Sequence, residues 1–216
     1  MRNPLREDQS KLRQSLLPGL LRRMRENRNR GSESVALFET GRVFYARPWA
    51  EDGRVPHQPM RLAAAIVGRY GTSRLGEATA AADVNSALAL VALLASDLGV
   101  IIGREQATGP GFHPTRTARL FVDDAAIGFA GELHPDVADE FELGGRVAVF
   151  EIDLGPLLAG QPHVQMSTVS TVPHVDFDLS FEVAMEAAAG RLAAETAALS
   201  PLVEKASIFD DYRETA

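Results

Sequence analysis

The sequence predicts a protein of the α+β class, in which strands pair with strands and helices flank the sheet. Short apolar runs rich in β-branched and aromatic residues recur along the chain and predict strands. Segments with apolar residues at three-to-four spacing lie between them and predict helices. At 216 residues, with 45% hydrophobic and 24% charged residues, the chain is long enough for one large domain, or for one domain and part of another.

The first predicted helix begins near Ser15, whose hydroxyl can cap free backbone amides, and it tolerates Pro18 only within its first turn. We expect this helix to end near Gly31. The next elements in order are two short strand pieces around a glycine over residues 35–44, a proline-containing loop over residues 47–59, and a mostly apolar strand over residues 61–68.

The clearest helix pattern begins at Asp83 and ends at Gly99, with apolar residues at three-to-four spacing between them. Such a stripe predicts a face buried in the core. The following elements are a hairpin over residues 118–133 that turns at Asp123 and Asp124, a short helix from His134 and Pro135 to Phe141, and a strand over residues 146–152.

The composition changes after residue 155. Residues 155–173 are rich in Pro, Gly, Ser and Thr, which is typical of a linker or a domain edge. Residues 177–183 then alternate strictly between apolar and polar, as in a half-buried strand, and an alanine-rich helix over residues 187–199 and a strand over residues 206–209 follow. A lone β-α-β unit of about 45 residues buries little core, so we expect the last domain to be cut short.

The charge is spread unevenly along the chain. The net charge is -7, yet residues 1–31 contain nine Lys or Arg against three Asp or Glu. This basic segment is either a solvated helix face or a contact for RNA or an acidic partner. There is no cysteine, which excludes disulfides, thiolate metal sites and cysteine nucleophiles. No apolar run approaches the roughly 20 residues of a membrane span, so we expect a cytoplasmic protein with no membrane partner.

Common catalytic motifs are missing from the sequence. Neither lysine follows a glycine, so the Walker phosphate loop is excluded, and no nucleophile elbow or dinucleotide fingerprint is in register. The five histidines never fall at the i, i+4 spacing of a helical metal site, and we predict no metal ligands. One alternative stays open, a stand-alone small-molecule enzyme of the same α+β outline that uses carboxylates such as Glu132 or Asp176 as acid and base. That alternative requires a deep pocket with perturbed carboxylates.

Three stretches, in this order, carry a resemblance to a known family. The first is Leu-Arg-Gln-Ser-Leu-Leu-Pro-Gly over residues 12–19 with Leu-Phe-Glu-Thr-Gly-Arg-Val-Phe over residues 37–44; the second is Phe-His-Pro over residues 112–114 with Gly-Phe-Ala-Gly-Glu-Leu-His-Pro over residues 128–135; the third is Val-Pro over residues 172–173 with Asp-Leu-Ser-Phe over residues 178–181 and Phe-Asp-Asp-Tyr-Arg over residues 209–213. Together they resemble the C-terminal part of the beta subunit of bacterial phenylalanyl-tRNA synthetase.

The resemblance implies both a fold and a function. Residues 1–160 would form a module like a class II aminoacyl-tRNA synthetase catalytic domain, an antiparallel sheet with flanking helices that has lost its activity. Residues 161–171 would be a linker, and residues 172–216 part of a ferredoxin-fold anticodon-binding domain. The module would scaffold the catalytic alpha subunit in an enzyme that attaches phenylalanine to tRNA(Phe) with ATP and magnesium. The complete last domain would contact the tRNA, and the fragment itself would hold no cofactor.

The residues at the expected catalytic motifs support an inactive module. Class II adenylation needs a motif-2 arginine that holds the α-phosphate, because the transition state requires fixed positive charge. In the related alpha-subunit pattern that arginine follows directly after Gly-Arg-Val-aromatic, whereas Tyr45 stands there in this sequence. Residues 145–151 also lack the glycines and the terminal arginine of motif 3. We therefore regard Glu39, Arg42 and Tyr45 as degenerate motif-2-like positions, name no catalytic residue, and predict that the fragment alone is inactive.

The resemblance also implies a surface that packs against the alpha subunit. Apolar leucines adjoin an arginine cluster between residues 12 and 30, a combination enriched at protein interfaces. Our candidates for this surface are Arg13, Leu16, Leu20, Arg23 and Arg28. The alternative is that the leucines belong to the core and that the arginines are solvated.

Overall fold

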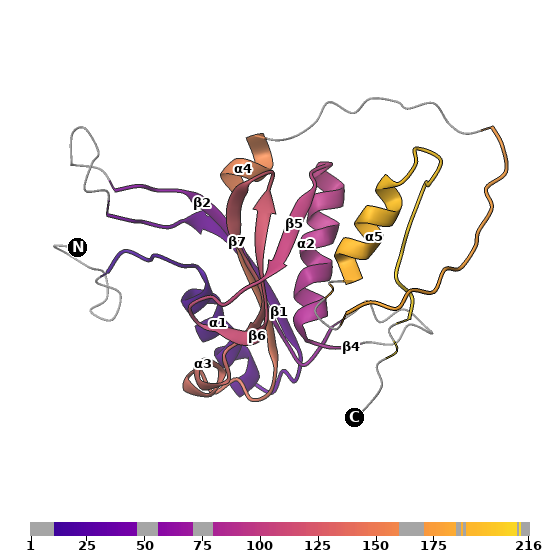
Figure 1. Ribbon diagram of the computed structural model, residues 1–216. Coiled ribbons are helices and arrows are strands. Elements are labelled where there is room, and N and C mark those ends of the chain that lie inside the picture. Colours follow the sequence, from indigo (N-terminus) through magenta and orange to yellow (C-terminus); the bar gives the residue numbers. More distant parts are fainter. Residues whose placement is uncertain are drawn as a thin grey trace. The chain divides into compact units, whose positions relative to one another are not determined.

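The computed structural model describes residues 11–46, 56–70, 80–159, 171–184, 187, 189–210 and 212. The chain divides into two compact units, Met1–Gln165 and Met166–Ala216. The first unit contains a six-stranded antiparallel sheet flanked by helices, which confirms the predicted α+β class (Figure 1). The described helices are α1 Leu17–Asn29, α2 Val84–Leu98, α3 Pro135–Glu140, α4 Leu154–Ala159 and, in the second unit, α5 Ala189–Ala198.

The large sheet has the strand order β1-β2-β8-β7-β6-β5, and every neighbouring pair is antiparallel. Because β2 pairs directly with β8, strands from the first and last parts of the unit meet in the middle of the sheet. A separate two-stranded ribbon pairs β3 with β4. The strands are β1 Val35–Arg42, β2 Met60–Val67, β3 Arg69–Tyr70, β4 Ala80–Ala81, β5 Ile102–Gln106, β6 Phe112–Val122, β7 Ala125–Leu133 and β8 Val147–Asp153.

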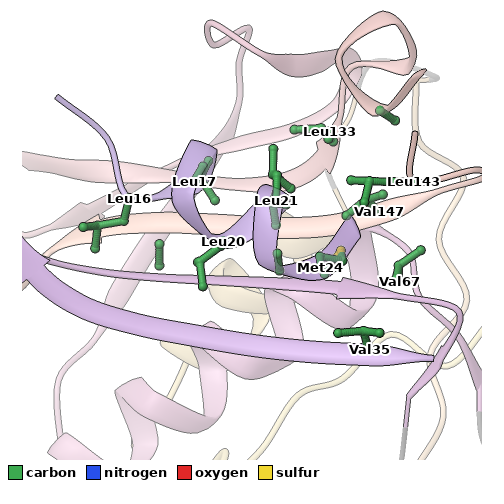
Figure 2. Close-up of a cluster of buried hydrophobic side chains, with 14 of the residues drawn as sticks. Leu16, Leu17, Leu20, Leu21, Met24, Val35, Val67, Leu133, Leu143 and Val147 are labelled. Carbon is green, nitrogen blue, oxygen red and sulfur yellow. The ribbon is translucent and has the colours of Figure 1, made fainter. Parts of the chain in front are cut away.

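Two apolar cores lie on opposite faces of the sheet, since successive strand residues point to opposite sides. On one face α1 and α3 pack against side chains such as Val35, Val67 and Val147. On the other face α2 and α4 pack against side chains such as Ile66 and Phe150. Figure 2 shows the first core, in which the apolar stripe of α1 points onto the strands.

The local signals of the sequence place both long helices correctly. In α2 the side chain of Asp83 accepts a hydrogen bond from the amide of Ser86 at 3.0 Å, and Gly99 ends the helix in the left-handed conformation at φ +66°. In α1 the hydroxyl of Ser15 accepts from the amide of Leu17 at 3.2 Å, and Pro18 lies in the first turn as predicted. Side chains close to a helix end satisfy amides that have no partner within the helix, which is why these ends are readable from sequence.

Several strand predictions need correction. The two strand pieces expected around Gly41 are one continuous strand, because Gly41 pairs with Arg61 and the ladder does not break there. The hairpin at Asp123 and Asp124 is confirmed, although β6 begins earlier than expected. The sequence did not predict β5, which adds a polar outer strand to β6. Residues 47–55 of the predicted loop lie outside the described residues.

In the second unit only the helix prediction is confirmed. The helix α5 lies within the predicted residues 187–199, but residues 177–183 and 206–209 form no strand. All residues from 171 to 184 are exposed, and none of them belongs to a described strand. A strand forms only when a neighbouring backbone accepts its hydrogen bonds, so alternation alone was not sufficient. The ferredoxin-like arrangement and the predicted domain boundaries therefore stay predictions, and residues 161–170 of the linker lie outside the described residues.

Candidate functional site

Three candidate residues meet at the end of β1. The guanidinium of Arg13 donates to the carboxylate of Glu39 at 2.5 Å, and its Nε donates to the carbonyl oxygen of Arg42 at 2.9 Å. The side chain of Arg13 crosses directly over Gly41, where a Cβ atom would overlap its guanidinium. The structure thus brings Arg13, a proposed interface residue, together with Glu39 and Arg42, which the sequence analysis proposed as motif-2-like positions. Because Gly41 has no side chain, the Arg13 side chain has room to pass over it.

Tyr45, which follows β1, binds to two other segments of the chain, at Gln14 and at His57. Its hydroxyl donates to the carbonyl oxygen of Gln14 at 2.7 Å. Its backbone exchanges two hydrogen bonds of 2.9 Å with His57. The guanidinium of Arg61 lies 5.5 Å from the centre of the Tyr45 ring, a cation–π distance. Burial raises the pKa of Tyr45, so its hydroxyl stays a donor, and the side chain acts as a structural clamp.

A buried carboxylate in β8 anchors the start of α1. Glu151 in β8 is 7% exposed. Its two oxygens accept hydrogen bonds from the Ser15 hydroxyl at 2.7 Å and from the Leu16 amide at 2.8 Å, and Arg61 lies 3.7 Å away. The residue preceding α1 offers no side-chain cap of its own, so Glu151 supplies the acceptor that the helix start needs. Sequence analysis missed Glu151 and Arg61; a charged residue inside an apolar strand was the available signal.

A second buried carboxylate, Glu132 in β7, joins its strand to β6, to α2 and to the residue that precedes β8. It is 1% exposed. It accepts from Arg116 at 2.7 Å, from the Val84 amide at the start of α2 at 3.1 Å, and from both the Nε and an Nη atom of Arg146. Burial opposes the ionisation of Glu132, but the hydrogen bonds from Arg146, Val84 and Arg116 outweigh it and hold the pKa below its usual value.

These geometries do not favour the alternative of a carboxylate-based enzyme. A general acid needs a carboxyl pKa raised toward neutrality, whereas that of Glu132 is lowered and its oxygens are already bound. The side chain of Asp176 is 94% exposed and lies 3.5 Å from His174, on the surface of the second unit. Neither carboxylate lines the hollow of about 510 Å³ beside the start of α2 or the hollow of about 480 Å³ between α2 and β1. The arrangement offers ion pairs that hold strands and helices together.

The structure divides the proposed interface residues into two groups. Leu16 and Leu20 are 1% and 5% exposed and belong to the core under α1 (Figure 2). This corrects the proposal for these two residues, because such side chains have no surface to offer a partner. Arg13 and Arg23 remain largely exposed, and Arg23 pairs with Glu26 at 2.7 Å. Arg28 donates to the carbonyl oxygen of Glu33 at 2.5 Å and lies half-buried.

Two further properties concern the described residues alone. They contain no group of three or more His, Cys, Asp or Glu arranged to hold a metal ion. None of their helices has the length and apolarity that crossing a bilayer requires.

Comparison with known proteins points to one family. A family model described as the phenylalanyl tRNA synthetase beta chain CLM domain matches residues 1–154. The phenylalanine–tRNA ligase beta subunit of Leifsonia xyli subsp. xyli is 35% identical over 237 residues, which cover 99% of this chain and 28% of that protein. The corresponding subunit of Symbiobacterium thermophilum is 36% identical over 216 residues, which cover 98% of this chain and 24% of that protein.

The chain thus spans about a quarter of the length of the curated relatives it matches. Among solved structures, a pyrrolysyl tRNA synthetase of Desulfitobacterium hafniense aligns with 68% of this chain and 48% of its own, at 15% identity and a TM-score of 0.48. The match over residues 1–154 confirms the resemblance in the sequence: this chain belongs to the family of phenylalanyl-tRNA synthetase beta chains.

Proposed function

We propose that this chain is a non-catalytic module of the beta subunit of phenylalanine–tRNA ligase. Its role is to hold the catalytic alpha subunit while that subunit attaches phenylalanine to tRNA(Phe) at the expense of ATP. Membership of the beta-chain family supports this role. The single observation that carries the non-catalytic part is Tyr45, which stands at the motif-2 arginine position and uses its hydroxyl to bind Gln14.

The arginine side chains near Tyr45, those of Arg13 and Arg42, are not free to bind a nucleotide phosphate either. The Arg13 guanidinium is bound to Glu39, and the Arg42 guanidinium donates to the carbonyl oxygen of Gln58 at 3.0 Å. A phosphate site needs donors that are free to point at the ligand. ATP and magnesium therefore belong, in this proposal, to the alpha subunit and not to the module described here.

The finer fold assignment belongs to the same proposal. Residues 1–160 correspond to a class II synthetase-like module, in which β1 and β2 would be the counterparts of the two motif-2 strands. Their antiparallel pairing over eight residues supports this correspondence. Residues 172–216 correspond to part of a ferredoxin-fold domain, which contacts tRNA only when it is complete. The parent enzyme works in the cytoplasm.

The alpha subunit would contact arginines around the start and along α1, of which Arg13 and Arg23 are exposed and Arg28 is half-buried. Arg13, Arg23 and Arg28 are the members of the proposed surface whose side chains are not in the core. Arginine is enriched at interfaces because its planar guanidinium binds carboxylates in two places and stacks on aromatic rings.

Size-exclusion chromatography with light scattering tests the scaffold role. The chain is run alone and mixed with the phenylalanyl-tRNA synthetase alpha subunit from the same source, and we expect a stoichiometric complex. Replacing Arg23 by Glu reverses one exposed charge and is expected to weaken the complex without unfolding the chain. Separate elution of two folded proteins contradicts the proposal. Saturable ATP binding by the isolated chain would contradict the non-catalytic assignment.

A further inference from the structure

One segment of the second unit presents a row of exposed apolar residues. It precedes α5, belongs to no described strand, and is drawn in Figure 1 as an irregular trace. Residues 175–183 alternate strictly between apolar and polar, so an extended backbone would place every apolar side chain on one face. Each of the apolar residues has more than half of its surface exposed; they are Val175, Phe177, Leu179, Phe181 and Val183. Such a segment gains both hydrogen bonds and apolar burial when another strand pairs with it.

The order of these apolar residues is a palindrome. Read from either end, it is Val, Phe, Leu, Phe, Val, with Leu179 at the centre. Two copies that pair antiparallel about a two-fold axis at Leu179 would place this leucine opposite its own copy. Each Phe177 would lie opposite Phe181 of the other copy, and each Val175 opposite Val183. Residues that lie directly opposite share a face, and aromatic pairs across strands are stabilising.

The palindrome selects a second copy of the chain as the partner. A contact on a two-fold axis uses the same surface of both copies, so that surface must complement itself. An axis at Ser180 would instead set Phe177 opposite valine and Leu179 opposite phenylalanine. The axis at Leu179 is the one that matches the apolar residues by size within residues 175–183.

The polar side chains on the other face make this pairing sensitive to charge. Asp178 would lie opposite Ser180 of the other copy, where its carboxylate can accept a hydrogen bond from the hydroxyl. Asp176 would lie opposite Glu182, a like-charge pair that weakens the contact on each side of the axis. The affinity between copies should therefore respond to the charge at residue 182.

Other parts of the second unit can cover the apolar face of the paired strands. A two-stranded ribbon is marginal by itself and needs a helix on its apolar face. None of the residues of α5, all of which the structure describes, is buried, so each copy has a helix available for this role. Leu199 and Phe209 are also exposed, by 80% and 76%. Together with residues 175–183 they offer on the order of 800 Å² of apolar surface per copy, which is what a standard interface buries on each partner.

We propose that two copies of the chain associate through residues 175–183, which pair as antiparallel strands about a two-fold axis at Leu179. The α5 helices of both copies cover the apolar face of the pair. This association does not depend on the proposed function, because it uses the second unit, whereas the surface proposed for the alpha subunit lies in the first.

Light scattering over a concentration series of the full 216-residue chain tests the association. We expect a dimer. Leu179→Asp sets two carboxylates opposite each other on the axis and is expected to weaken the dimer by about tenfold or more. Leu158→Asp is the control, because Leu158 in α4 is 56% exposed and Leu179 is 57% exposed. A monomer at every concentration, or a dimer that Leu179→Asp leaves unchanged, overturns the proposal.

Single cysteines locate the axis, because the chain contains none of its own. In the proposed pair, Leu179→Cys places two sulfur atoms on strands whose Cα atoms are about 5 Å apart, within the range of a disulfide. Phe177→Cys is the control, since its two copies would be separated by about 13 Å along the strands. Mild oxidation followed by a non-reducing gel should show covalent dimers at least about tenfold faster for Leu179→Cys. Equal rates for the two variants contradict the axis at Leu179.

A charge reversal tests the register from the polar face. Glu182→Lys turns both like-charge pairs with Asp176 into opposite-charge pairs and is expected to tighten the dimer by about threefold or more at low salt. Glu204→Lys is the control, since Glu204 is exposed outside the paired segment and its reversal changes the net charge equally. Equal tightening by both variants would show that only net charge matters and would contradict the register. A monomeric chain that still binds the alpha subunit would overturn this association and leave the proposed function intact.

Discussion

The carboxylate of Glu151 in β8 accepts a hydrogen bond from the backbone amide of Leu16 at 2.8 Å, although the two residues lie 135 positions apart in the chain. The same carboxylate accepts from the Ser15 hydroxyl at 2.7 Å. A strand from the end of the first unit thereby supplies the cap for its first helix. This relationship explains why β8 contains a buried charged residue directly after an apolar run, and it leads to the first prediction.

Glu151→Ala is expected to lower the free energy of unfolding by about 2 kcal/mol or more, because the Leu16 amide is left without its acceptor in a buried place. Urea denaturation monitored by circular dichroism measures the change. Glu105→Gln is the control, since Glu105 is exposed on β5. Equal stability of the Glu151→Ala variant and the unmodified chain would mean that the helix start finds another acceptor.

Glu132 predicts a pH dependence of stability. Its pKa in the folded chain lies below the unfolded value near 4.5, so its ionised form stabilises the fold. This contribution is fully present above the unfolded pKa and is lost as the pH falls through the folded pKa. Glu132→Gln breaks the pairs with Arg116 and Arg146 and is expected to cost about 3 kcal/mol at neutral pH.

To test this, the free energy of unfolding is measured for the unmodified chain and for the Glu132→Gln variant between about pH 3 and pH 7. Their difference should shrink as the pH falls below the unfolded pKa, because a protonated Glu132 resembles the Gln side chain. A difference that stays constant over this range would show that the charge of Glu132 does not stabilise the fold.

Tyr45→Arg places an arginine at the proposed motif-2 position, but it is expected to give no adenylate formation. The new guanidinium would lie beside Arg61, and the hydrogen bond to Gln14 would be lost. ATP–pyrophosphate exchange of the isolated chain measures the activity. Tyr45→Phe is the control, which removes only the hydroxyl and should cost about 1 kcal/mol of stability. Exchange above background would show that one residue separates this module from an active one.

Gly131→Ala is expected to destabilise the fold by about 3 kcal/mol. A Cβ atom at this position of β7 would come within 2.8 Å of the Thr117 Cα and closer still to the Arg116 carbonyl oxygen, and neither backbone atom can move aside. Gly19→Ala in α1 is the matched control, because its Cβ meets only Glu39 at an ordinary 3.8 Å. That control should stabilise the helix by about 0.5 kcal/mol or more. A thermal melt of each variant measures these changes in stability. A Gly131→Ala variant that melts at the temperature of the unmodified chain would contradict the prediction.

Leu20→Ala separates a core role from an interface role. Leu20 is 5% exposed under α1, so truncation should lower the free energy of unfolding by about 3 kcal/mol. Leu158→Ala is the control, since Leu158 in α4 is 56% exposed and should change stability little. A Leu20→Ala variant of unchanged stability that no longer binds the alpha subunit would return Leu20 to the interface.

The sequence by itself determined the elements whose signals are local. The cap at Asp83, the stop at Gly99 and the turn at Asp123 each depend on hydrogen bonds or backbone angles within a few residues. The family also followed from residues that stand together in short stretches. Such features are readable because the interacting groups are neighbours in the chain.

Only the tertiary structure decided which residues pair across long separations. It joined Glu151 to Leu16 and Glu132 to Arg116 and Arg146, and it placed Leu16 in the core. It also left residues 177–183 outside any described strand despite their alternation. A period of two specifies the faces of a strand but not its partner, and a buried charge is stable only beside a partner that the fold supplies.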